Sequence, residues 1–194
     1  AIPSSFTPFT LSKKNGYENL SDARSNATNA DVNLTWDLTE FGKTYGSEFH
    51  NNDDIKTSFT IRRATDCVCG QIDYDWGAGA PAYAVYQTKQ LTPPNETPTR
   101  MVVRVFGDGS NSRLTLRVMD ATGEKFVRDF GVLSWTGWQT VTLNIDKTWS
   151  HSAGNNDGVI DLPVSQVAVQ LSRANNSAKT GRVLVKDFAL TFPN

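Results

Sequence analysis

Residues 113–120 read RLTLRVMD, and the turn residues ATG follow at 121–123. Leu114, Leu116 and Val118 alternate with polar or charged residues, which is the period of a β-strand that buries one face. Residues 166–172, QVAVQLS, repeat the alternation near the C-terminus. These two stretches predict strands that each pack one face on a hydrophobic core.

The same period of two recurs along most of the chain, and no 3.6-residue stripe is long enough for a major helix. Turn residues such as GDGS at 107–110 separate the predicted strands. These strands are Val32–Thr39, Thr57–Arg63, Gly70–Trp76, Ala82–Gln87, Met101–Gly107, Arg113–Asp120, Lys125–Phe130, Gln139–Asn144, Gln166–Arg173 and Arg182–Phe192. Many short strands at close spacing favour an all-β fold, a β-sandwich, over a parallel sheet.

The length of 194 residues fits one all-β domain, so we expect residues 1–194 to form a single β-sandwich. Residues 1–56 are rich in Asn and Ser, with strand signal near Phe6–Leu11 and Val32–Thr39. We expect them to supply the first strands and long loops of the sandwich, and a small N-terminal subdomain is the alternative. Leu91–Arg100 contains three prolines and is predicted to connect the two sheets.

Charge and composition argue against two classes of function. The formal net charge is −1, so no general field attracts nucleic acid or an anionic membrane. No apolar run approaches the ~18 residues of a membrane-spanning helix. The first residues, AIPSS, fit a chain end left by signal cleavage, and we expect a secreted or extracellular protein.

Two cysteines, Cys67 and Cys69, lie two residues apart. On a regular strand their Cα atoms would be ~6.5–7 Å apart, at the limit that a disulfide tolerates. A bulge or loop would let them form a bridge in an oxidising compartment, and two small buried thiols are the equally weighted alternative.

Asp73 and Asp75 flank Tyr74, so both carboxylates share one face of a predicted strand. Paired carboxyls at this spacing can hydrolyse a glycosidic bond, but many exposed β-strand faces carry such pairs without catalysis. A lyase would need a His or Tyr base instead, for which His151, Tyr83 and Tyr86 are available. No nucleophile-elbow, zinc-protease or P-loop motif is present.

Aromatic residues are the other chemical resource of the central region. Flat exposed rings can stack on the apolar faces of sugars, and polar side chains can bind the sugar hydroxyls. We predict this role for Trp76, Tyr83, Tyr86 and Trp149, whereas Trp138 opens an alternating strand and is predicted in the core.

Several short motifs follow one another in a familiar order. They are QIDYDW at 71–76, AYAVY at 82–86, VFGDGS at 105–110, DATG at 120–123, WTGW at 135–138 and VLVKDF at 183–188. This order resembles the jelly-roll carbohydrate-binding modules of secreted bacterial polysaccharide-degrading enzymes, over about residues 57–192.

The resemblance implies a jelly roll of two antiparallel sheets that binds a polysaccharide without cleaving it. It also implies a structural calcium, with Asp187 of the last strand as a ligand and Glu18 as a second candidate. Lys186 stands where many members of the family have a second aspartate. Such modules are covalently linked to a catalytic domain, and we expect this one to be monomeric.

The sequence therefore predicts a non-catalytic carbohydrate-binding module, with a compact polysaccharide lyase or glycoside hydrolase as the alternative. The predicted ligand-binding residues are Trp76, Tyr83, Tyr86, Trp149, Asp73, Asp75, Arg104 and Arg117. The two arginines can bind uronate or sulfate groups, or donate hydrogen bonds to a neutral glycan.

Overall fold

The computed structural model shows a β-sandwich. It describes residues 55–65, 67–77, 82–88 and 93–193 in full. Of the N-terminal region it describes only the backbone of β1 (Leu11–Lys14), β2 (Tyr17–Leu20), β3 (Val32–Thr35) and β4 (Glu48–Phe49). The predicted strand at Phe6–Leu11 and the long loops of residues 1–56 lie largely outside the described residues. The described part of the chain contains no helix that could cross a membrane.

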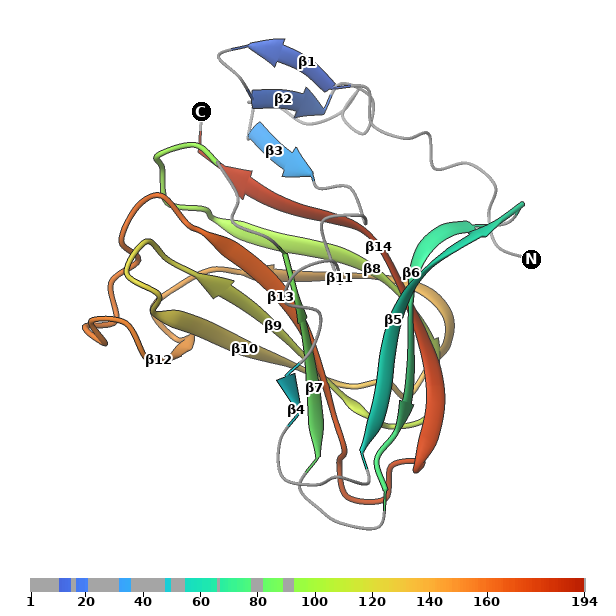
Figure 1. The fold of residues 1–194 in the computed structure, drawn as a ribbon. Coiled ribbons are helices and arrows are strands. Elements are labelled where there is room, and N and C mark those ends of the chain that lie inside the picture. Colours follow the sequence, from blue (N-terminus) through green and yellow to red (C-terminus); the bar gives the residue numbers. More distant parts are fainter. Residues whose placement is uncertain are drawn as a thin grey trace.

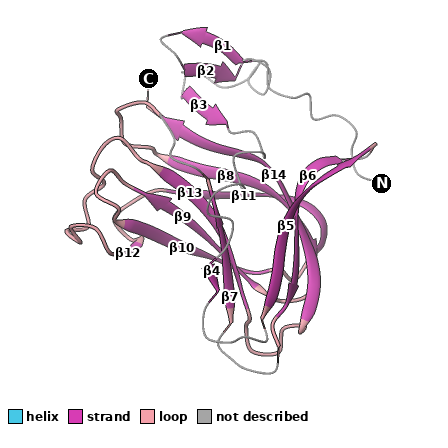
Figure 2. Ribbon diagram, in the orientation of Figure 1, coloured by secondary structure: helices cyan, strands magenta, loops and turns pink. Residues whose placement is uncertain are grey.

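Two antiparallel sheets make up the sandwich (Figures 1 and 2). Sheet I has the order β11-β8-β14-β6-β5, with β3 also paired to β14, and sheet II has the order β12-β10-β9-β13-β7-β4. The strands of sheet I are β5 (Lys56–Ala64), β6 (Cys67–Asp75), β8 (Arg100–Asp108), β11 (Thr136–Asn144) and β14 (Thr180–Phe192). Those of sheet II, besides β4, are β7 (Tyr83–Gln87), β9 (Arg113–Met119), β10 (Lys125–Val132), β12 (Ser150–Ser152) and β13 (Gln166–Ser172).

The core lies between the sheets and is built by the predicted alternation. Leu114, Leu116 and Val118 of β9 are fully buried, and so are Val103 and Val105 of β8 in the same cluster. Removing these side chains from water is the main favourable term in folding. The structure therefore confirms the predicted fold class, an all-β sandwich of two antiparallel sheets.

Each of the ten predicted strands overlaps an observed strand. The short strands β2, β4 and β12 were not predicted, and β12 carries three exposed residues with no alternation. Strand β10 continues past Phe130 because a bulge between Asp129 and Gly131 absorbs one residue. Residues 93–99, the described part of the proline-rich stretch, lead directly into β8 of sheet I.

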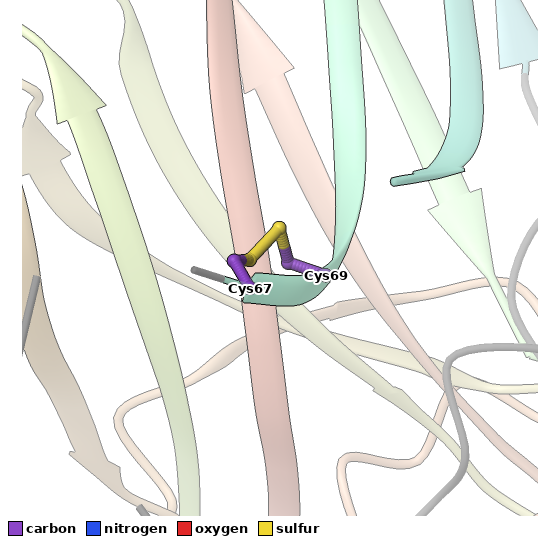
Figure 3. Close-up of a disulfide and its surroundings, with 2 residues drawn as sticks. All are labelled: Cys67 and Cys69. Carbon is purple, nitrogen blue, oxygen red and sulfur yellow. A yellow bond between two sulfur atoms is a disulfide. The ribbon is translucent and has the colours of Figure 1, made fainter. Parts of the chain in front are cut away.

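Cys67 and Cys69 are joined in a disulfide at the start of β6 (Figure 3). Their Cα atoms are 5.6 Å apart, which is closer than in a regular strand. The bridge packs against Leu184 on the outer face of sheet I. Because both sulfur atoms are in the disulfide, the alternative of two free thiols is wrong.

Candidate functional site

The outer face of sheet II carries polar side chains that alternate with small apolar ones. Cross-strand pairing places Gln87, Ala168, Arg117 and Val127 side by side on β7, β13, β9 and β10. In the next row Gln170 lies between Val85 and Thr115. The amides of Gln87 and Gln170 and the guanidinium of Arg117 therefore surround the small side chain of Ala168.

Arg117 is the central charged group of this face. Its side chain is buried, and Nη2 donates to Oε1 of Gln170 at 3.4 Å. A buried guanidinium loses its hydration, so it stays in a folded protein only when neighbours bond to it. Gln170 on the adjacent strand is therefore one of the neighbours that bind Arg117.

Tyr83 marks one end of the same face. It is half-buried, and it is paired across the strands with Ser172, which is paired in turn with Arg113. Arg113 forms an exposed ion pair with Asp129 of β10. Of the predicted ligand-binding residues, the structure brings Tyr83 and Arg117 together on this face.

Three predicted stacking residues are core residues instead. Trp76 is fully buried, stacks on Tyr74 with 4.8 Å between ring centroids, and donates from Nε1 to Ser112 at 3.4 Å. Trp149 is also buried, and its Nε1 donates to the carbonyl of Asn144 at 2.7 Å. The prediction that these two rings are exposed to a ligand is wrong.

Tyr86 is the third of these residues. Its hydroxyl lies 2.6 Å from the hydroxyl of Thr57, and its ring packs on Phe59. Burial raises the pKa of Tyr86 above the usual value for tyrosine. The prediction of an exposed ring is wrong here too, and a buried phenol with a raised pKa is poorly suited to act as a lyase base.

Asp73 and Asp75 lie on the outer face of sheet I, on the opposite side of the sandwich from Arg117. They line a surface hollow of about 310 Å³ together with Lys56, Thr57, Ser58 and Tyr74. Asp75 accepts from the backbone N–H of Gly77 at 2.9 Å.

Asp73 accepts from Arg182 at 2.6 Å and from Gln71 at 2.8 Å. Burial raises the pKa of Asp73, but these hydrogen bonds and the charge of Arg182 outweigh it, so its pKa is lower than usual. Because a glycosidase acid needs a raised pKa, this carboxyl is a poor proton donor. The lowered pKa of Asp73 therefore argues against Asp73 as the acid of a paired-carboxylate mechanism.

Arg104 also lies on the outer face of sheet I, beside Trp138 and Lys186. Its guanidinium carbon is 5.7 Å from the centroid of the Trp138 ring. Trp138 is half-buried on this outer face and packs edge-on against Phe106, so its predicted place in the core is wrong.

Asp187 sits at a bulge in β14, with a backbone φ of 54°. Burial raises the pKa of Asp187, and the charges of Lys186 and Arg104 lower it. Its Oδ2 atom has no hydrogen-bond partner among the described residues. Such an atom could bind a cation, but two positive side chains nearby oppose a divalent ion.

Calcium usually takes six to eight oxygen ligands, several of them carboxylates. Within the described ranges no group of three or more His, Cys, Asp or Glu residues could hold a metal ion. The side chain of Glu18 lies outside the described residues. Calcium therefore stays a prediction.

Several residues of these two faces were not predicted. Gln87 lies on the same face of β7 as Tyr83, because the two are four residues apart, so the sequence could have shown that they share a face. Gln170 is on the same face of the sheet, because it pairs with Val85, which lies between them. Phe130 is exposed although its position in the alternation is that of the buried Phe126. A bulge between Asp129 and Gly131 turns its side chain toward solvent, and Gly131 is the only sign of this bulge in the sequence of β10.

No protein-family model matches the chain, and no curated protein sequence matches it. Solved structures do match. A family 11 carbohydrate-binding module from Clostridium thermocellum, in complex with a β-1,3-1,4-mixed-linked tetrasaccharide, superposes with a TM-score of 0.55 at 15% identity. The match covers 86% of this chain and 98% of that module. The family 11 module of a cellulosomal cellulase of the same organism gives 0.55 at 14% identity, over 86% of this chain and 96% of that one.

At this level of identity the comparison establishes the fold. The chain has the two-sheet β-sandwich architecture found in family 11 carbohydrate-binding modules, and nearly the whole length of each module is matched.

Proposed function

We propose that the protein is a non-catalytic carbohydrate-binding module that binds a polysaccharide on the outer face of sheet II. The observation that carries the proposal is the set of partly exposed polar side chains on this face, Gln87, Gln170 and Tyr83, with Gln170 accepting a hydrogen bond from the buried Arg117. Tyr83 adds an aromatic group at the end of that face.

The chemistry of this face suits a sugar. Amide and guanidinium groups offer donors in a fixed geometry, and the amide oxygens of Gln87 and Gln170 add acceptors. The hydroxyl groups of a sugar both donate and accept, so they can complete hydrogen bonds that a rigid sheet has already oriented.

The similar fold of a module bound to a β-1,3-1,4-mixed-linked tetrasaccharide supports a β-glucan as the first ligand to test. We also propose that the module is secreted by a bacterium, is monomeric, and directs a linked catalytic domain to its substrate. The Cys67–Cys69 disulfide supports an oxidising compartment, because such bridges seldom persist in the cytosol.

Affinity electrophoresis in mixed-linkage β-glucan, with the same samples assayed for released reducing sugar, tests the proposal. Each lost hydrogen bond costs about 0.5–1.5 kcal/mol, so the double variant Q87A/Q170A is expected to bind about 5- to 150-fold more weakly. Thr140→Ala, an exposed change on the outer face of sheet I, is the matched control.

Retention of the wild type without released sugar supports a binding module. Equal retention of wild type and Q87A/Q170A would place the ligand elsewhere, and release of sugar would favour the enzyme alternative.

A further inference from the structure

A polar hollow lies at the edge of sheet I, on the neighbouring strands β5 and β6 (Figure 1). Its volume of about 310 Å³ is at the lower end of the range of ~300–1,000 Å³ that is typical of small-molecule sites. The six residues that line the hollow are Lys56, Thr57, Ser58, Asp73, Tyr74 and Asp75. The hollow is therefore large enough for a small ligand, and its lining is almost entirely polar.

Four of these residues project from the same face of the strand pair. Lys56 is directly opposite Asp75, and Ser58 is directly opposite Asp73. Residues two apart in a strand share a face, so the four side chains stand together on the outer face of sheet I. One ammonium group, one hydroxyl group and two carboxylates therefore border the hollow.

Both carboxylates are held in place by hydrogen bonds that leave them further capacity. Asp73 accepts from Arg182 and Gln71, and Asp75 accepts from the backbone N–H of Gly77. A carboxylate offers about four acceptor positions, of which Asp73 uses two and Asp75 uses one within the described part of the chain. The two carboxylates are thus oriented acceptors that can each take another O–H or N–H donor.

Lys56 supplies donors on the other side of the hollow. Its side chain is exposed, and an ammonium group has three N–H donors. A surface ion pair between Lys56 and Asp75 would contribute little to stability, so a ligand can replace it at low cost. Ser58, which is also exposed, can either donate or accept.

Each carboxylate of the hollow faces one cation. Lys56 is opposite Asp75, and Arg182 forms an ion pair with Asp73. Charges that are opposed in pairs give little preference for an anionic or a cationic ligand. A neutral ligand that both donates and accepts suits this lining better, and the hydroxyl groups of a sugar do both.

We propose that this hollow is a second carbohydrate site, which binds a neutral sugar unit through adjacent hydroxyl groups. Two O–H groups of the sugar donate to Asp73 and Asp75, and Lys56 donates to a hydroxyl oxygen of the same unit. Tyr74, the one aromatic residue of the lining, is buried and donates to Asp108, so hydrogen bonds rather than ring stacking hold the sugar. The site is on the opposite side of the sandwich from the proposed glycan face of sheet II and does not depend on it.

The test follows the assigned backbone amide signals of the whole chain by nuclear magnetic resonance. Three disaccharides are titrated: neutral cellobiose, anionic digalacturonate and the cationic disaccharide of glucosamine. Cellobiose is expected to shift the amides of β5 and β6 that line the hollow, and to bind there more tightly than either charged disaccharide. The amides of sheet II report on the other proposed site in the same spectra.

The double variant K56A/D75A removes one opposed pair and leaves the net charge unchanged. The affinity for cellobiose measured at the hollow is expected to fall about tenfold or more, because charge-assisted hydrogen bonds are lost on both sides of the sugar. The matched control is E96A/K147A, which also removes one exposed residue of each sign and lies outside β5 and β6.

Asp75→Asn serves if the double variant folds poorly, because its amide oxygen still accepts from the N–H of Gly77. Its expected loss of affinity is about threefold or more, since a neutral acceptor replaces a charged one. Far-ultraviolet circular dichroism confirms the fold of each variant.

Cellobiose shifts at the hollow that weaken in K56A/D75A but not in E96A/K147A support the second site. Three results overturn it: no cellobiose shift at these amides in wild type, tighter binding of a charged disaccharide there, or equal loss in the two double variants. Absence of shifts in sheet II alone counts against the proposed β-glucan face and leaves this result intact.

Discussion

Replacing Trp76 by alanine distinguishes a core residue from a binding residue. The ring is fully buried, stacks on Tyr74 and donates a hydrogen bond to Ser112. Truncation of a buried aromatic side chain to alanine costs about 3–5 kcal/mol. For a protein of this size each kcal/mol lowers the melting temperature by about 2–4 °C, so we expect a fall of about 6–20 °C.

The assay is equilibrium unfolding in urea, followed by circular dichroism. Phe130→Ala is the control, because its side chain is 37% exposed and touches Trp135 edge-on. Its expected loss is below about 1.5 kcal/mol. Trp76→Phe keeps a ring but gives up the long bond to Ser112 and part of the buried indole, so it is expected to cost less than Trp76→Ala and tests the same idea if the alanine variant does not fold. Wild-type stability of Trp76→Ala together with lost glycan binding would refute the assignment of this ring to the core.

Three other predictions concern stability. The Cys67–Cys69 bridge closes a loop of about three residues, so C67A/C69A should lower the free energy of unfolding by only about 1.6 kcal/mol on the loop-entropy estimate, and a loss above about 4 kcal/mol in urea unfolding would contradict this. Gly70→Ala would bring a Cβ atom to 2.8 Å from Cε2 of Phe59 on β5, so we expect the free energy of unfolding to fall by about 1–3 kcal/mol in the same assay. An unchanged urea midpoint would contradict this. Because the pKa of Asp73 is lowered in the folded state, its ion pair with Arg182 stabilises the protein above about pH 4, and this contribution is lost as the pH falls further. The difference in the free energy of unfolding between wild type and Asp73→Asn should therefore shrink in acid. A difference that stays constant from pH 7 to pH 3 would contradict the pairing.

The period of two in the sequence was enough to predict the longer strands of both sheets, because a strand that packs one face on a core must alternate. The same parity also held information about the site. Trp76 shares the parity of the buried Ile72, whereas Asp73 and Asp75 point to the other face. These residues could therefore not form one binding surface, and the loop residues next to Trp76 misled the prediction of exposure.

Trp138 and Phe130 show where parity is not enough. Trp138 alternates correctly, but alternation does not say which of the two faces of a strand meets the other sheet. Phe130 has core parity, and a bulge next to Gly131 turns it toward solvent. Both outcomes depend on neighbouring strands that are distant in the chain.

By itself the sequence determined the strand content, the all-β class and the residues that share a face of each strand, because these follow from local geometry and hydrophobic alternation. Only the tertiary structure decided which strands are neighbours. That choice places Gln170 beside Arg117 and sets Lys186 opposite Arg104, across contacts that join β13 to β9 and β14 to β8. A surface assembled from strands far apart in sequence depends on the register of the sheets, and register is fixed by packing of the whole core.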